Sequence, residues 1–281
     1  MAGAVADHAW ASSDARSSNG VRLNLAPERF APMRDSTEVA DQPDELRRRI
    51  AEDGYVLLRG VLDRSAVLRL RDEYFTRLET VVTAGAPAYG TPGHPAYDFV
   101  RSPVFDAFTR DPALAGIAEL LMDGAVELVP RRIVRHFEAH SVGASRAHVD
   151  IDYLDHGTTE VLTAWIPLGD CPIAAGGLIY LEGSHRASRA DLDALRPYTD
   201  RPDDARPVSN DLGRTATALG GRWLWADLRA GDLAVHTAQI VHASLDNVSD
   251  APRLSIDVRF RRNGDARDER WDGDWSADDG Y

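Results

Sequence analysis

HASLDNVSDAPRLSIDVRF, residues 242–260, begins with a histidine, passes through the turn-forming segment LDNVSDAP, and ends in a run of alternating character. Alternation of period two indicates a β-strand whose two faces are Leu254, Ile256, Val258, Phe260 and Arg253, Ser255, Asp257, Arg259. If the apolar face packs against helices, the polar face lines the inside of a barrel, where an arginine needs an anionic partner. The alternative is a polar face that points outward over an ordinary core.

The rest of the chain divides into a helical front and a β-rich second part. Apolar periodicity predicts helices over 43–52, 64–82 and 102–124, with a short strand at Tyr55–Arg59. After Gly124 the chain continues as short β-rich runs separated by turns: VELVPRRIVRHFEA, TEVLTAWIPLGD, GGLIYLEGSH and GDLAVHTAQIVHAS. This order predicts a mainly β fold, a sandwich or barrel, with flanking helices that brace one sheet.

The length of 281 residues is compatible with one elaborated domain. We expect a flexible N-terminal arm over 1–40, because this segment is rich in Ala, Ser, Asp and Pro without a sustained period. The single domain then spans 41–281, with a helical front at 43–124, a β region at 125–262 and an acidic C-terminal tail at 263–281. The Pro/Asp-rich insertion at 187–222 is expected to cover the mouth of a site.

Composition narrows the function further. The 32 basic residues are all arginine, so Schiff-base chemistry on a lysine is excluded, and Cys171 is the single cysteine, which excludes an internal disulfide. The net charge of −13 disfavours nucleic acid and anionic membranes as partners. No apolar run is long enough to cross a bilayer and no leader pattern precedes the domain, so we expect a cytoplasmic protein.

A candidate metal site lies in SRAHVDIDYL, residues 145–154. His148 and Asp150 are two residues apart, so on a strand both side chains emerge on one face and can converge on one ion. Chance alone yields about one His-x-Asp pair in a chain of this composition, and a surface strand edge is the ordinary alternative. His242 would complete two histidines and a carboxylate, which leave three positions of an octahedral iron(II) open.

Other histidines compete for the same role. His136 and Glu138 have the same spacing as His148 and Asp150, and His236 lies six residues before His242. Only His242 has an arginine eleven residues later at the start of the next strand. Asp152 is two residues after Asp150, on the same face of the expected strand. We expect it to support the metal site or to contact the substrate.

The combined motifs resemble the phytanoyl-CoA dioxygenase family of iron(II)/2-oxoglutarate oxygenases. The segments that carry the resemblance, in chain order over about residues 45–262, are EDGYVLLRGVL, AHVD, TAWIPLGDCPIAAGGLIYLEGSHR, GDLAVHTAQIVHAS and APRLSIDVRF. Glu182 departs from the family pattern, because a proline is usual at that position before the Gly-Ser-His turn. The resemblance implies a double-stranded β-helix, or jelly roll of the cupin type, at 125–262.

The resemblance also implies roles for single residues. His148, Asp150 and His242 match the catalytic iron(II) ligands, and Arg253 matches the arginine that binds the distal carboxylate of 2-oxoglutarate. Arginine suits this role because its planar fork can hold a carboxylate bidentately. The remaining residues expected to line the cosubstrate site are Ser244, Trp165 and Thr163, with core packing as the alternative for Trp165. O₂ is the third reactant that this class of enzyme requires.

The substrate expected from sequence is a small molecule. The arginine-only, GC-biased composition is similar to that of actinomycete enzymes that tailor antibiotics and other natural products, by hydroxylation or by ring closure such as orthoester formation. The acidic balance suits a cationic or polyhydroxylated, sugar-derived substrate, with Tyr153, Asp152, the 83–99 loop and the 187–222 insertion as its expected contacts. The alternatives are an acyl-CoA hydroxylase of the same family and a metal-binding jelly roll without oxygenase activity.

Overall fold

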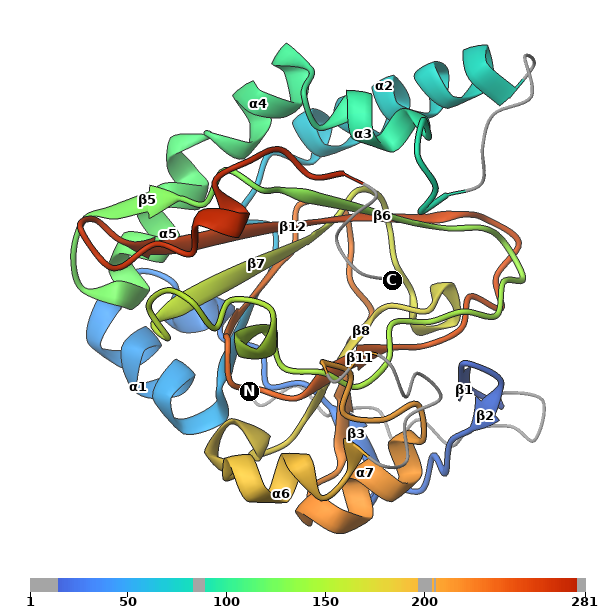
Figure 1. Ribbon diagram of the computed structural model, residues 1–281, viewed down its shortest axis with the longest axis vertical. Coiled ribbons are helices and arrows are strands. Elements are labelled where there is room, and N and C mark those ends of the chain that lie inside the picture. Colours follow the sequence, from blue (N-terminus) through green and yellow to red (C-terminus); the bar gives the residue numbers. More distant parts are fainter. Residues whose placement is uncertain (1–14, 83–88, 197–203, 205, 277–281) are drawn as a thin grey trace.

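The structure is a computed structural model that describes residues 15–82, 89–196, 204 and 206–276. Parts of the predicted arm (1–14), loop (83–88), insertion (197–203 and 205) and tail (277–281) lie outside the described residues. Two sheets form the centre of the molecule, and helices lie along both of them (Figure 1).

The larger sheet has six strands in the order β4-β10-β7-β12-β5, and β6 also pairs with β12. All of its pairings are antiparallel. Its strands are β4 (Tyr55–Leu58), β5 (Val126–Leu128), β6 (Ile133–Phe137), β7 (Val161–Pro167), β10 (Leu233–Thr237) and β12 (Arg253–Arg262). The longest strand, β12, lies between β7 on one side and β5 and β6 on the other, so its backbone is paired along both edges. All its residues except Arg262 are buried.

The smaller sheet has four strands in the order β11-β8-β9-β3. These are β3 (Phe30–Pro32), β8 (Leu178–Leu181), β9 (Trp223–Trp225) and β11 (His242–Ser244), and only the β3–β9 pairing is parallel. One small cavity is lined by Thr163 and Arg253 from the larger sheet and by Leu178 and His242 from the smaller one, so the two sheets face each other. This is the jelly-roll arrangement predicted from sequence.

Helices of the front cover the outer face of the larger sheet. They are α1 (Pro43–Asp53), α2 (Arg64–Val82), α3 (Pro95–Phe99), α4 (Pro103–Thr109) and α5 (Pro112–Met122). Local sequence sets their ends: proline stands in the first turn of α1, α3, α4 and α5, and Gly54 ends α1 with a φ of 79°. The smaller sheet is flanked by α6 (Arg189–Asp193) and α7 (Leu212–Leu219), both within the predicted insertion (Figure 1).

The alternation predicted for residues 253–260 is confirmed. Leu254, Ile256, Val258 and Phe260 belong to the apolar core between the larger sheet and the front helices. Arg253, Asp257 and Arg259 line the cavity between the sheets. The polar face of β12 is therefore the inner face of the barrel, and the alternative of a solvent-facing polar surface is wrong.

The predicted loop at 83–99 is partly helical, because α3 occupies Pro95–Phe99. Its start has a local cause, since the His94 side chain accepts a hydrogen bond from the Ala96 N–H and Pro95 stands in the first helical turn. Short 3-10 turns complete the described elements: η1 (Thr37–Val39), η2 (Asp150–Asp152), η3 (Ile173–Ala175), η4 (Ser184–Arg186) and η6 (Glu269–Trp271). The division into one domain with the boundaries given above stays a prediction.

Residues 15–40 do not behave as the flexible arm that composition suggested. A hairpin of β1 (Ser17–Ser18) and β2 (Val21–Arg22) is followed by β3, which pairs with β9. Asp246 anchors the hairpin by accepting hydrogen bonds from the Ser17 hydroxyl and from the backbone N–H groups of Asn19 and Gly20. Composition misled here because the polar residues of this segment have partners far along the chain.

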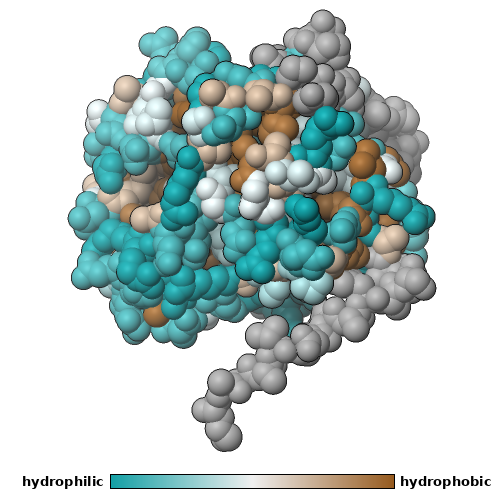
Figure 2. Space-filling model, turned by 90° about the horizontal axis from the view of Figure 1, so that it is seen from below, coloured by the Kyte–Doolittle hydropathy of each residue, from teal (hydrophilic) through white to brown (hydrophobic). Residues whose placement is uncertain are grey.

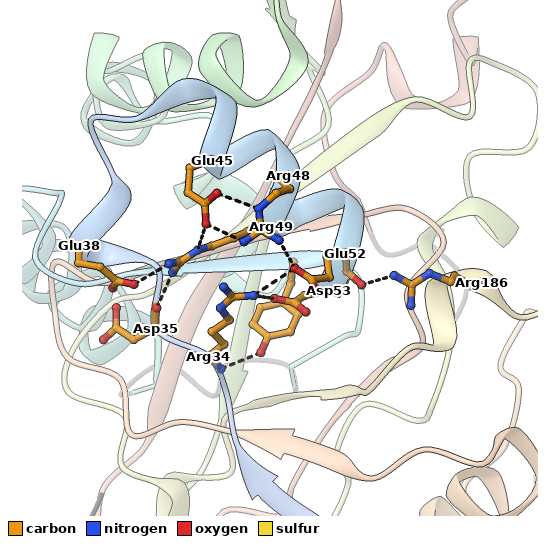
Figure 3. A network of polar contacts seen from close by, with 10 residues as sticks. Arg34, Asp35, Glu38, Glu45, Arg48, Arg49, Glu52, Asp53 and Arg186 are labelled. Atoms are coloured by element: carbon orange, nitrogen blue, oxygen red, sulfur yellow. Dashed lines mark hydrogen bonds and ion pairs between the residues drawn. The ribbon is translucent and has the colours of Figure 1, made fainter. Parts of the chain in front are cut away.

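An ion-pair network fixes the end of this N-terminal segment against α1 (Figure 3). Arg34 pairs with Glu52 and Asp53 at 3.3 Å, and the buried Arg49 pairs with Glu38 at 2.6 Å and Glu45 at 3.1 Å. Exposed pairs of this kind contribute roughly 0–1 kcal/mol each, so their main effect is to hold the segment in place.

Polar residues cover most of the face in Figure 2. No helix among the described residues is both long and apolar enough to span a membrane.

Candidate active site

His148 and His242 lie opposite each other where two chain segments meet between the sheets. Each backbone N–H donates to the other residue's carbonyl, at 3.0 and 2.9 Å, and the ring centroids are 4.1 Å apart. Asp150 does not continue a strand, as the sequence had suggested, but begins the 3-10 turn η2. That turn still brings its carboxylate to both rings, with Oδ1 3.9 Å from His148 Nε2 and 3.7 Å from His242 Nε2.

Backbone carbonyls orient the two imidazoles. Nδ1 of His148 lies 2.7 Å from the Arg146 carbonyl, and Nδ1 of His242 lies 3.1 Å from the Ile240 carbonyl. Since a carbonyl can only accept, each Nδ1 carries the proton and each Nε2 keeps its lone pair toward Asp150. Burial lowers the pKa of His148 and holds the pKa of His242 well below its ordinary value, so both rings are neutral.

Asp150 is buried, with 2% of its surface exposed, and remains ionised. Burial alone would raise the pKa of its carboxyl, but the Arg259 guanidinium at 3.1 Å holds that pKa well below the usual range. The Thr163 hydroxyl donates a second hydrogen bond to Oδ2 at 2.5 Å. The carboxylate is therefore both charged and held in one orientation.

These three side chains fit a divalent metal ion. Their ligand atoms all lie within 4.8 Å of one another, and among the described residues no other group of three or more His, Cys, Asp or Glu side chains meets that criterion. Two neutral imidazole nitrogens and one carboxylate oxygen are the donor set of non-haem iron(II) oxygenases, with positions left open for reactants. The three residues predicted as ligands are thus brought together by the fold.

A cavity of about 20 Å³ lies beside the metal ligands and ends at Arg253. Arg253 is 3% exposed, and its Nε and Nη2 groups have no hydrogen-bond partner among the described residues. Its guanidinium lies 4.0 Å from the centroid of the Phe137 ring, and burial lowers its pKa. An unpaired buried cation is costly, so this arginine is suited to receive an anion such as a carboxylate.

The other residues expected around the cosubstrate line the same cavity. It contains His148, Thr163, Trp165, His242, Ser244 and Arg253, which are all the predicted site residues except Asp150. The Ser244 oxygen accepts a hydrogen bond from the Ser145 N–H at 2.8 Å, which leaves its own proton available to a ligand. Trp165 also belongs to a buried cluster, so its packing role and its place in the cavity wall coexist.

The competing histidines lie near this site but do not complete it. His236 Nε2 lies 3.7 Å from Asp150 Oδ2, while its Nδ1 is hydrogen-bonded to the Tyr180 hydroxyl at 2.8 Å. Its ring centroid lies 4.6 Å from that of His242, but its nitrogens are not part of the group of ligand atoms that His148, Asp150 and His242 form. His136 and Glu138 approach each other at 3.6 Å, but the Glu138 side chain is 75% exposed and no third donor from the described part of the chain joins them.

A second and larger cavity, of about 510 Å³, also reaches the metal ligands and shares Arg135, Ser145, His148 and Arg259 with the smaller one. His148 and Asp150 form part of its wall, and so do Tyr153 from the predicted substrate shell and Pro207 from the 187–222 insertion. Asp152 does not line it, because its carboxylate is held by Arg189 and, at 2.6 Å, by Arg196. The interpretation of Asp152 as a substrate contact is therefore wrong, and its role is to anchor the insertion.

Several residues of the larger cavity were missed by sequence reasoning. These are Asn19 from the N-terminal hairpin, Arg135 and His136 from β6, and Trp271 and Trp275 from the C-terminal tail. The two tryptophans stood out as apolar residues in an acidic tail, which is a signal that they are buried. Trp275 is 1% exposed and packs against Tyr97 with ring centroids 4.5 Å apart.

A jelly roll with two histidines and an ionised aspartate at its centre, and with an unpaired arginine at the end of the adjoining cavity, defines a non-haem iron(II)/2-oxoglutarate oxygenase. Residues 50–255 match the family described as phytanoyl-CoA dioxygenase. The chain belongs to this family, as its motifs had indicated.

Curated and solved relatives agree with this placement. The chain is 24% identical over 247 residues to the 1-deoxypentalenic acid 11-beta-hydroxylase of Streptomyces exfoliatus, covering 81% of this chain and 84% of that protein. It resembles the crystal structure of the α-ketoglutarate-dependent carbocyclase SnoK from nogalamycin biosynthesis, with a TM-score of 0.61, 22% identity and coverage of 84% and 89%. The epimerase SnoN, solved with Fe3+, α-ketoglutarate and nogalamycin RO, gives a TM-score of 0.59 at 24% identity, covering 81% and 86%. These structures share the fold of this chain.

Proposed function

We propose that this protein oxidises a C–H bond of a small natural product, using iron(II), 2-oxoglutarate and O₂. The observation that carries the proposal is Arg253, which lines the cavity beside the metal ligands. Its guanidinium is buried, and its Nε and Nη2 groups have no hydrogen-bond partner among the residues that the structure describes. A metal-binding jelly roll without oxygenase activity has no need for this cation. In the hydroxylating form, substrate R–H, 2-oxoglutarate and O₂ give R–OH, succinate and CO₂; ring closure is the second outcome that we expected from sequence.

Three residues would hold the metal ion. His148, Asp150 and His242 would hold iron(II), which supplies the redox chemistry that couples oxidation of 2-oxoglutarate by O₂ to oxidation of the substrate. Their own contribution is two neutral nitrogens and one ionised oxygen fixed by Arg146, Ile240 and Thr163. Because position 150 is an aspartate, no ligand position is vacated for chloride, and halogenation is disfavoured.

The cosubstrate would bind at the smaller cavity. The volume of about 20 Å³ there has room for about one or two water molecules, so binding requires the cavity walls to move apart. Arg253 would bind its distal carboxylate through two N–H groups, the Ser244 hydroxyl would donate to the same group, and Trp165 would form a wall. Thr163 is expected to act through Asp150, because its hydroxyl proton is already committed to that carboxylate. The dry setting strengthens each of these contacts, since Arg253 and Ser244 are each 3% exposed.

The substrate would occupy the larger cavity, whose volume of about 510 Å³ suits a drug-sized molecule. The relatives act on such compounds: one is named a hydroxylase of 1-deoxypentalenic acid, and another was solved with nogalamycin RO. Of the cationic and polyhydroxylated substrates expected from the net charge, the wall favours the second, because it contains Arg146 as well as Arg135 and Arg259, which are paired with Asp257 and Asp150. An acyl-CoA remains the competing substrate class, and substrate assays include it.

The test is succinate formation by purified protein with iron(II), 2-oxoglutarate and O₂. Enzymes of this class turn over 2-oxoglutarate slowly without substrate, so we expect succinate above the level given by free iron, and loss of it when iron is chelated. Stimulation by a polyhydroxylated or polycyclic natural product identifies the substrate class. Absence of succinate under all conditions contradicts the oxygenase function, and stimulation by acyl-CoA alone contradicts the natural-product substrate.

A further inference from the structure

The larger cavity contains a buried histidine that the proposed chemistry does not use. His136 lies on β6, is 5% exposed and forms part of the cavity wall. Its Nε2 atom is buried and has no hydrogen-bond partner among the described residues. The nearest carboxylate, Glu138, is 3.6 Å away, which is too long for a hydrogen bond.

The partner on the other side of the ring determines which nitrogen carries the proton. The Tyr74 hydroxyl lies 3.1 Å from His136 Nδ1, and Tyr74 is 1% exposed. If Tyr74 donates, its only proton is satisfied, Nδ1 accepts, and Nε2 carries a hydrogen. The reverse arrangement leaves the Tyr74 proton buried without an acceptor, which costs about 1–3 kcal/mol. His136, a residue of the cavity wall, therefore carries an N–H donor on Nε2 that has no hydrogen-bond partner among the described residues.

The ring is neutral under ordinary conditions. Burial, with added repulsion from the positive charges of Arg71 and Arg253, lowers the pKa of His136 to about 4. A ligand atom that meets this N–H must accept a hydrogen bond. An ammonium group has only N–H donors and cannot do so.

Neighbouring groups favour the same kind of ligand. Arg135 and Arg146 also belong to the cavity wall, and guanidinium groups only donate. The Nε group of Arg135 already donates to Asp257 at 2.6 Å, so only its other N–H groups could meet a ligand. Glu138 is the acidic residue of this wall besides the metal ligand Asp150, and its side chain is largely exposed to solvent. The polar part of the wall is therefore rich in donors and poor in buried acceptors.

Aromatic rings supply the apolar part of the wall. Tyr89 and Trp275 lie near each other, with centroids 6.2 Å apart, and Tyr89 lies 6.2 Å from His136. Trp271 is held by a hydrogen bond from its Nε1 to the Tyr153 carbonyl at 2.7 Å. Fixed aromatic faces next to a fixed donor suit a rigid ring system that bears an oxygen substituent.

Resting on the proposed function, we infer that the substrate is a ring compound whose carbonyl or carboxylate oxygen accepts a hydrogen bond from His136 Nε2, with its rings against Trp271 and Trp275. His136 is then a residue that determines substrate specificity. Compounds that carry an amine at the same position are rejected, because the N–H groups of the amine would face the N–H group of His136, and neither can accept a hydrogen bond.

The test uses three matched probes that differ in one substituent: 2-naphthoate, 2-acetylnaphthalene and 2-(aminomethyl)naphthalene. Binding is measured by calorimetry without O₂, on the protein loaded with iron(II) and 2-oxoglutarate and again on the metal-free protein. We expect the acid and the ketone to bind at least about tenfold more tightly than the amine. Equal or tighter binding of the amine, or no binding of any probe at millimolar concentration, overturns the inference.

Variants at position 136 assign the effect to the imidazole. His136→Phe keeps a ring but removes the donor, and should weaken the ketone about 3- to 10-fold and the acid about 10- to 100-fold, as expected for a neutral and a charged acceptor. His136→Gln places an N–H near the position of Nε2 and should recover part of the loss. The matched control His156→Phe alters an exposed histidine outside the cavity wall and should change neither affinity.

A direct reading of the tautomer covers the case in which His136→Phe fails to fold. Imidazole ¹⁵N spectra of the wild-type protein should show a protonated Nε2 and an unprotonated Nδ1 for His136. The opposite tautomer overturns the inference, and so do unchanged probe affinities in both folded variants. Succinate formation by the wild type separates the two proposals: its absence contradicts the oxygenase function, whereas the order of probe affinities on metal-free protein tests His136 alone.

Discussion

The two cavities that meet at the metal ligands are built from different parts of the chain. The smaller one is lined by strands of both sheets, including Thr163 and Trp165 on β7, Ser244 on β11 and Arg253 on β12. The larger one takes much of its wall from irregular segments, including 141–146, Pro207 and the two terminal regions. Strands fix the residues of the reaction, and loops and termini shape the space for the substrate.

This difference also follows the limits of the family match. Residues 50–255 include every residue that we assign to iron or 2-oxoglutarate. Asn19, Trp271 and Trp275, which line only the larger cavity, lie outside that range, and so do Asp257 and Arg259, which line the smaller one. The family match therefore covers the predicted metal ligands and Arg253, and the substrate must be inferred from this chain's own residues.

The largest effect should come from the metal ligands. His242→Ala or Asp150→Ala removes one donor of three, so we expect loss of iron binding and of succinate formation while the fold persists. Iron content after desalting and succinate release are the measurements. Normal activity in His242→Ala together with an inactive His236→Ala would show that the distal ligand is His236.

Arg253→Met should separate cosubstrate binding from folding. Loss of the ion pair costs about 3–5 kcal/mol, so the KM for 2-oxoglutarate should rise by two orders of magnitude or more. Because the guanidinium is buried and incompletely paired in the absence of cosubstrate, the same change should leave the Tm of the metal-free protein unchanged or raise it. An unchanged KM would place the carboxylate anchor elsewhere, with Arg135 as the next candidate.

Asp246→Asn should loosen the N-terminal side of the larger cavity. Its carboxylate accepts from Ser17, Asn19, Gly20 and, at 3.3 Å, Gly143, and an amide cannot accept at both positions. We expect a loss of about 1–3 kcal/mol in unfolding free energy. Amide hydrogen exchange at Asn19 and Gly20 should accelerate, whereas the control Asp250→Asn on the same loop should leave it unaltered.

The smallest effect concerns the dependence of stability on pH. Burial, with Arg71 and Arg253, lowers the pKa of His136 to about 4, and burial, with His136, lowers the pKa of His94 to about 4. Their neutral forms stabilise the native state fully above the unfolded pKa of about 6.5, and this stability is lost as the pH falls toward 4. Each histidine contributes a slope of at most about 1.4 kcal/mol per pH unit. Urea titrations of metal-free protein between pH 7 and pH 4.5 should show a shallower decline in His136→Gln than in the wild type.

Sequence was most informative where periodicity and spacing coincide. The alternation of residues 253–260 predicted both faces of β12. The family resemblance placed His242 and Arg253 at one site, and both line the same cavity. Spacing alone could not show that Asp150 begins a 3-10 turn, because His-x-Asp fits either conformation. The prediction that Asp152 contacts the substrate was wrong for the same reason, since the turn directs its carboxylate toward Arg189 and Arg196.

The walls of the larger cavity could not be predicted because their contacts are long-range. Ser17 and Asp246 are 229 positions apart, and no local pattern links them. In the sequence, His136 and Glu138 formed an alternative pair of metal ligands. Only the hydrogen bond between the Tyr74 hydroxyl on α2 and His136 Nδ1 indicates that Nε2 of His136 carries the proton. Polar composition at the termini likewise concealed two tryptophans that close the cavity.

A crystal structure with manganese(II), which replaces iron(II) without turnover, and 2-oxoglutarate tests the division between the cavities most directly. We predict the metal on His148, Asp150 and His242, and 2-oxoglutarate in the smaller cavity with its distal carboxylate on Arg253 and Ser244. The larger cavity should remain free of the cosubstrate. A cosubstrate bound in the larger cavity beside Arg135 and Arg146, or a metal held by His136 and Glu138, would contradict the account.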